Sequence, residues 1–74
     1  MIRETALDHT AYKSEFGSTV TCTLVYVNDT RWEVRIVQYF DIIYENRPPT
    51  VFGNERAARS YLRDIRDGIA RPLP

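Results

Sequence analysis

Hydrophobic and polar residues alternate through the middle of this chain in the manner of half-buried β-strands. Residues 19–28 are rich in β-branched and aromatic side chains, and one face carries Val20, Cys22, Leu24 and Tyr26. The other face carries mainly threonine and valine. We therefore predict a strand over residues 19–28 whose first face lies in the core and whose second face is partly solvated.

A second alternating segment covers residues 31–44 and is predicted to be one long strand. Its even-numbered face is apolar apart from Gln38, and its odd-numbered face begins with charges but becomes apolar at Val37, Tyr39 and Ile43. Either this second face becomes buried or lies at an interface, or a β-bulge near Gln38 shifts the pattern. Residues 28–30, Asn-Asp-Thr, favour a turn, so the two strands should form a hairpin.

The flanking segments are less regular. Residues 45–49 contain Pro48 and Pro49, which cannot donate to a strand ladder, so a loop is predicted there, followed by a short strand over residues 50–52. Residues 1–11 are weakly patterned. A short strand near residues 10–16 is expected, although Ala6, Leu7 and Ala11 also allow one or two helical turns.

A helix is predicted from Asn54 onward. Asn54 is a good N-cap, and Glu55 lies in the first turn, where the helix dipole favours an anion. The apolar positions span an arc of roughly 140°, which is a normal core-facing stripe; they are Ala57, Ala58, Tyr61, Leu62, Ile65 and Ile69. Gly68 and the following prolines end the helix and leave residues 71–74 as a tail.

These elements predict a single α+β domain over residues 1–74. Three or four antiparallel strands form a meander, and one C-terminal helix packs on one face of the sheet. The opposite face then lacks a second layer. Because apolar residues would lie on it, Val37, Tyr39 and Ile43 are candidates for a partner interface.

Four arginines form the only patterned surface chemistry. Arg56, Arg59, Arg63 and Arg66 fall within an arc of roughly 80° on the helix. One interpretation is a solvated face supported by ion pairs four residues apart, namely Glu55–Arg59, Arg63–Asp67 and Asp67–Arg71. The other is a binding face for phosphate or for an acidic protein surface. Only Arg56 and Arg66 lack an acid three or four residues away, so these two are expected to make no ion pair within the helix and to have positive charge available for a partner.

Composition restricts the classes of partner. Ten basic and ten acidic residues give a net charge of zero, which argues against a general nucleic-acid binder. Nine of the ten basic residues are arginine. This preference suits bidentate contacts with carboxylates, although a GC-rich genome would produce it as well. A lone cysteine, no apolar run near 20 residues and no signal-peptide pattern lead us to expect a cytoplasmic protein without a membrane partner.

No constellation of residues suggests catalysis. His9 and Cys22 are too few for a metal site, and Cys22 lies on the apolar face of its strand. Glu33 and Asp41 would lie roughly 26 Å apart on one strand, so they cannot form a carboxylate dyad. Because phosphate-binding loops and zinc motifs are also missing, we expect no enzyme activity, no cofactor and no metal.

The hairpin TVTCTLVYVNDTRWEVRI, the strand TVF and the helix NERAARSYLRDI together resemble small phage and mobile-element inhibitors, including some anti-CRISPR proteins. The resemblance is architectural, covers residues 19–67 and transfers no residue roles. It implies a protein that binds a larger host complex through a sheet or helix face and blocks it sterically or by occupying a nucleic-acid site. A non-enzymatic protein-binding module is therefore expected. The alternatives are a nucleic-acid-binding module that uses the four arginines and a homodimer formed through the open sheet face.

Overall fold

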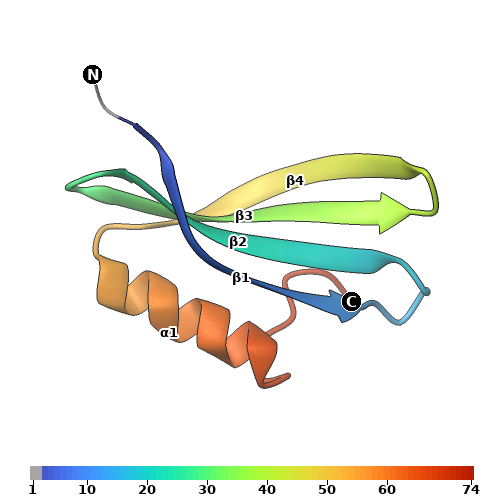
Figure 1. Ribbon diagram of the computed structural model, residues 1–74. Coiled ribbons are helices and arrows are strands. Elements are labelled where there is room, and N and C mark those ends of the chain that lie inside the picture. The colour runs from blue at the N-terminus through green and yellow to red at the C-terminus, as the bar shows by residue number, and fades with distance from the viewer. Residues whose placement is uncertain (1–2) are drawn as a thin grey trace.

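A four-stranded antiparallel sheet and one helix make up the computed structural model, which describes residues 3–74 (Figure 1). The strands follow one another in the order β1-β2-β3-β4, and α1 lies across one face of the sheet. The elements are β1 (Thr5–Lys13), β2 (Thr19–Asn28), β3 (Arg31–Phe40), β4 (Ile43–Phe52) and α1 (Glu55–Arg66). The predicted α+β meander with a C-terminal helix is confirmed.

The core lies between α1 and the two central strands. Its buried members are the alternating residues of β2 and β3 and three helix residues, namely Val20, Cys22, Leu24, Val34, Ile36, Ala58, Leu62 and Ile65. The helix begins where the sequence indicates, because the Asn54 side-chain oxygen accepts the Ala57 N–H at 2.8 Å. It ends before Gly68, whose φ of 79° is favourable for glycine.

The single strand predicted over residues 31–44 is wrong. β3 ends at Phe40, and a two-residue turn, Asp41-Ile42, reverses the chain so that Ile43 pairs with Phe40. Asp41 adopts a φ of 55°, a conformation that aspartate tolerates better than most residues. Apolar residues resume directly after Asp41, at Ile42 and Ile43, and the turn lacks the glycine that usually marks such a hairpin, so alternation alone does not reveal it.

The loop predicted around Pro48 and Pro49 is wrong as well, because β4 continues through both prolines. β4 is an edge strand, so its outward-facing positions need no N–H donor. The register shifts opposite the stretch between Val34 and Ile36, and this irregularity accommodates the two prolines.

Gln38 interrupts the apolar stripe for a reason other than the suggested bulge, because its pairing with both neighbouring strands is regular. It is buried, and its amide nitrogen donates to Ser18 Oγ at 2.8 Å. Ser18 Oγ shares a further hydrogen bond of 2.6 Å with Ser14 Oγ, and Arg47 donates to the Gln38 carbonyl oxygen at 2.8 Å. A satisfied polar network therefore replaces apolar packing beyond the end of the helix.

The N-terminal strand is longer than the sequence indicates. β1 covers Thr5–Lys13 rather than a short stretch near residues 10–16, and no helical turn forms among its residues. Its pairing with β2 is shifted between Ala6 and Asp8 by a bulge. This irregularity explains why residues 5–8 show no clear alternation in the sequence.

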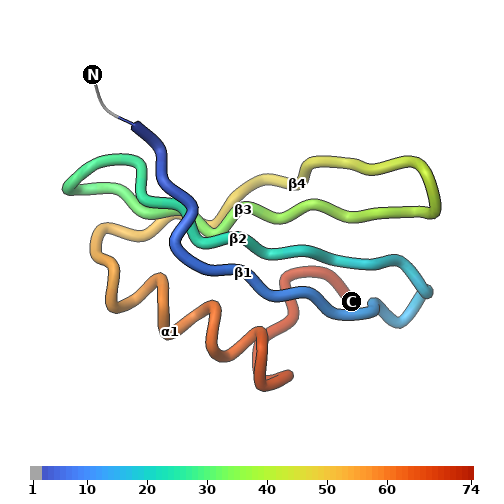
Figure 2. Tube along the Cα trace, viewed as in Figure 1, coloured from blue at the N-terminus to red at the C-terminus, as the bar shows by residue number. Residues whose placement is uncertain are grey.

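Residues 71–74, predicted to be a tail, pack on the domain. Figure 2 shows the C-terminal segment returning beside the end of β1. The Tyr12 hydroxyl donates to the Leu73 carbonyl at 2.7 Å and accepts the Leu73 N–H at 3.1 Å. The Arg71 guanidinium lies 4.1 Å from the centre of the Tyr12 ring. Tyr12 therefore joins the C-terminal segment to the first strand.

Candidate functional site

The four predicted arginines of α1 line one groove together with Asp8 of β1. The groove has a volume of about 810 Å³ and is open to solvent. Its lining residues are Asp8, Glu55, Arg56, Arg59, Ser60, Arg63 and Arg66. Four guanidinium groups therefore face two carboxylates, so this arginine groove carries an excess of positive charge.

Only one of the three ion pairs predicted within the helix forms. Arg59 Nε donates to Glu55 at 2.6 Å. Arg63 instead makes a long contact of 3.5 Å with the Ser60 hydroxyl, and Arg71 donates to the carbonyl of Ile65 at 2.5 Å. Asp67 has no ion pair among residues 3–74. The helix therefore neutralises fewer of its own arginines than their spacing suggests.

The expectation that Arg66 has positive charge available for a partner is wrong, because Arg66 makes an ion pair with Asp8. Its guanidinium contacts Asp8 at 3.0 Å and also donates to the His9 carbonyl at 3.2 Å. The hydrogen bond from Arg66, assisted by one from the His9 N–H, lowers the pKa of the Asp8 carboxyl. Because Asp8 and Arg66 are 58 residues apart, helical spacing could not reveal this pair.

Arg56 and Arg63 are the two arginines of the groove that have no carboxylate partner among the described residues. Within residues 3–74 neither makes an ion pair, and both side chains are exposed. They are seven residues apart on α1, which places them two turns apart on one side of the helix, roughly 10 Å along its axis. The free positive charge of the groove is therefore concentrated at these two positions.

The predicted sheet-face site does not form one surface. Val37 and Tyr39 lie on the face opposite α1, where the Tyr39 ring packs 5.8 Å from the Tyr44 ring. Ile43 is the cross-strand partner of Phe40, which shares the helix-side face with Ile36. Since cross-strand partners point to the same side, Ile43 lies on the other face from Val37 and Tyr39. The hairpin turn, which the sequence did not reveal, accounts for this error.

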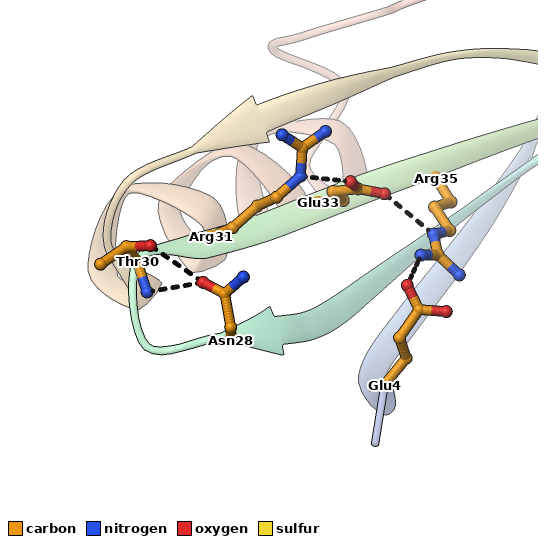
Figure 3. A network of polar contacts seen from close by, with 6 residues as sticks. All are labelled: Glu4, Asn28, Thr30, Arg31, Glu33 and Arg35. Atoms are coloured by element: carbon orange, nitrogen blue, oxygen red, sulfur yellow. Dashed lines mark hydrogen bonds and ion pairs between the residues drawn. The ribbon is translucent and has the colours of Figure 1, made fainter. Parts of the chain in front are cut away.

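The face opposite α1 also carries a charge network, drawn in Figure 3. The Glu33 carboxylate accepts from Arg31 Nε at 2.7 Å and from Arg35 Nε at 3.0 Å. Arg35 contacts Glu4 as well, and Glu33 itself is only 8% exposed. This part of the face is polar and internally satisfied, which makes it a poor surface for a homodimer.

The network predicts a pH dependence of stability. The two arginines hold the pKa of Glu33 below its ordinary value, first through the hydrogen bond from Arg31. A lowered pKa in the folded state stabilises the protein above the ordinary glutamate pKa, and this contribution disappears as the pH falls through the folded-state value. We expect Glu33→Gln to lose less stability than the wild type between pH 7 and pH 3, measured by urea unfolding. Glu45→Gln, which alters an exposed ion pair, is the matched control. Parallel curves for wild type and Glu33→Gln would contradict this role.

Exposed apolar side chains gather at the end of the sheet that holds the β1–β2 and β3–β4 turns. They come from both faces and both turns, and Ile42 is 97% and Phe16 80% exposed. We call this set the apolar tip; its members are Phe16, Tyr39, Phe40, Ile42, Ile43 and Tyr44. The sequence pattern does not reveal the apolar tip, because a continuous strand over residues 31–44 would place its residues along the faces of the sheet. Apolar exposure is therefore concentrated at an end of the sheet.

Cys22 and His9 do not form a reactive pair. Cys22 is fully buried on the helix-side face, whereas His9 is opposite Thr23, whose side chain points to the other face. Burial raises the pKa of the Cys22 thiol to about 11, so the thiol is protonated at neutral pH. Residues 3–74 also contain no group of three or more potential metal ligands.

We expect the Cys22 thiol of the folded protein to be inert toward Ellman's reagent at pH 8, because reaction requires an accessible thiolate. In strong guanidinium chloride the single thiol should react fully within minutes. Absorbance at 412 nm measures both reactions. Rapid labelling of the folded protein would show that Cys22 is accessible, and a thiol-dependent function would then have to be considered.

The only helix described for residues 3–74 is α1, which at 12 residues is too short and too polar to cross a bilayer. Comparisons with protein-family models, with curated proteins and with solved structures found no match to the chain. Function is therefore inferred from the geometry of the groove and the surfaces around it.

Proposed function

We propose that this protein is a non-enzymatic protein-binding module that holds an acidic segment of a partner in the arginine groove. The observation that carries the proposal is that Arg56 and Arg63 make no ion pair within the described part of the chain, residues 3–74. The chain has as many acidic as basic residues, yet these two exposed arginines line one groove and neither makes an ion pair with a carboxylate of residues 3–74. Guanidinium groups bind carboxylates through short, charge-assisted hydrogen bonds, and such a groove suits a ligand that supplies them.

The spacing of the two arginines suits a peptide. An extended chain rises about 3.3 Å per residue and alternate side chains share a face, so carboxylates on one face are about 7 Å or about 13 Å apart at spacings of two or four residues. These two distances bracket the axial separation of Arg56 and Arg63, which is roughly 10 Å. A segment with two or three acidic residues in such an arrangement would neutralise both guanidinium groups at once.

Binding an acidic surface suggests how the module acts. A domain of this size that occupies an acidic surface on a larger assembly would block access to it sterically, as the resemblance to phage and mobile-element inhibitors implies. We place this activity in the cytoplasm, since a lone buried thiol suits a reducing compartment.

Self-association by strand pairing is the less favoured alternative because both sheet edges are protected. β4 carries Pro48 and Pro49, and β1 is bulged beside Asp8. At His9, the N–H donates to Asp8 and the carbonyl accepts from Arg66. Prolines, bulges and satisfied edge groups all disfavour pairing with a second chain.

Fluorescence anisotropy with two labelled probes of equal charge tests the proposal. The probes are a short poly-L-glutamate and a single-stranded DNA, each at 50 mM and 300 mM salt. We expect poly-L-glutamate to bind more tightly than DNA, and its affinity to fall at 300 mM salt because exposed charges are screened. Tighter binding of DNA would favour the nucleic-acid module instead. No binding of either probe at 50 mM salt would refute both functions.

A further inference from the structure

We infer that Asp8 is an internal ligand of the arginine groove, occupying a carboxylate subsite that an acidic residue of the partner takes over on binding. This inference rests on the proposed function. It adds a third position to the groove beside Arg56 and Arg63, and it gives the free protein an autoinhibitory contact at the edge of β1.

The contacts of Asp8 are those of a bound carboxylate. One oxygen accepts from the Arg66 guanidinium at 3.0 Å, and the other accepts the His9 N–H at 2.8 Å. A guanidinium and a backbone N–H that converge on one carboxylate make a specific anion site. Asp8 itself is not buried, and its side chain lines the groove, so another carboxylate can reach the same donors.

The subsite does not depend on Asp8 for its shape. Arg66 is also held by the His9 carbonyl at 3.2 Å, which positions its guanidinium over β1. The His9 N–H belongs to a strand paired with β2 and is likewise fixed. Both donors therefore stay in place when Asp8 turns away, and the site is preorganised for the incoming acid.

The same residues indicate an extended ligand. The His9 N–H donates to Asp8 and the His9 carbonyl accepts from Arg66. Both of these partners line the groove. A displaced Asp8 leaves the His9 N–H open to a ligand carboxylate or to a backbone carbonyl of a strand laid along β1. An acidic segment in extended conformation supplies both kinds of acceptor.

Asp8→Asn tests the inference because it removes the charge but keeps an oxygen that accepts the His9 N–H. We expect the affinity for poly-L-glutamate to rise on the order of fivefold, since the ligand no longer competes with an exposed ion pair. Glu15→Gln makes the same change in net charge outside the groove, and it should alter the affinity less than about twofold because of screening. Thermal melting establishes that each variant is folded.

Arg66→Gln completes a double-mutant cycle. In the Asp8→Asn background it should abolish the gain in affinity. In the wild type it should lower affinity, because it removes a donor of the subsite and leaves the Asp8 carboxylate in the groove without its guanidinium partner. The inference is overturned if Asp8→Asn behaves like Glu15→Gln, or if its gain survives the Arg66→Gln substitution. Wild-type binding that is weakened by substitution of Arg56 and Arg63 but unaffected by Asp8→Asn would refute only this inference. Loss of all poly-L-glutamate binding would refute the proposed function itself.

Discussion

Leu62→Ala is expected to lower the free energy of unfolding by about 2–5 kcal/mol. Leu62 is 1% exposed and lies in the middle of the buried face of α1, where it packs with Ala58 and Ile65 against β2 and β3. Truncation leaves a cavity that the sheet beneath cannot close, because its side chains are already tightly packed. In a domain this small, the loss is a large fraction of total stability.

Urea unfolding followed by Trp32 fluorescence measures this change. Ile69→Ala is the matched control, because Ile69 is 75% exposed and its truncation should cost less than about 0.5 kcal/mol. Equal effects of the two substitutions would mean that α1 does not form the second layer of the core. The positions of the groove arginines relative to β1 would then be in doubt.

Reversing both free arginines, Arg56→Glu with Arg63→Glu, is expected to weaken poly-L-glutamate binding by about tenfold to a hundredfold. Each exposed ion pair contributes about 0.2–1 kcal/mol, and reversal adds repulsion of comparable size at both positions. Neither arginine makes an ion pair within residues 3–74, so the folded domain should keep its stability. The change should therefore appear in binding and not in unfolding.

A control variant separates this local effect from net charge. Arg3→Glu with Lys13→Glu alters the net charge equally, and both residues are exposed and lie outside the groove. At 150 mM salt, where screening acts over about 8 Å, the control should retain most of the affinity. If both double variants lose binding to the same degree, the groove is not the site. Arg66→Glu is a poor test of the groove, because it would also break the contact with Asp8.

The core and the helix could be predicted from the sequence because each depends on a local period. Alternation in residues 19–28 identified the buried face of β2, and the apolar stripe with Asn54 fixed the start of α1. The second hairpin could not be predicted in this way. Its turn, Asp41-Ile42, keeps the alternation of the flanking strands, so the pattern shows no break there. The two prolines are tolerated because β4 lies at the edge of the sheet, and that position depends on how all four strands are arranged.

The candidate site could likewise be predicted only in the part that depends on helical spacing. Helical spacing placed the four arginines on one side of α1, and the structure brings all four into one groove. Which of them are free depends on a contact between Arg66 and Asp8, which come from opposite ends of the chain. The expected pair Arg63–Asp67 does not form, so within residues 3–74 the second arginine of the groove without an ion pair is Arg63 and not Arg66. Long-range contacts of this kind leave no periodic signal in a sequence.

An NMR titration of the ¹⁵N-labelled protein with poly-L-glutamate tests the central claim most directly. It follows the backbone amides together with the side-chain Nε–H signals of Arg56 and Arg63. If an acidic ligand binds in the arginine groove, we expect the largest shifts on α1 between residues 56 and 66, on both arginine side chains, and on residues 8 and 9 of β1. Shifts confined to the apolar tip around Ile42, or to the face that carries Val37 and Tyr39, would contradict it.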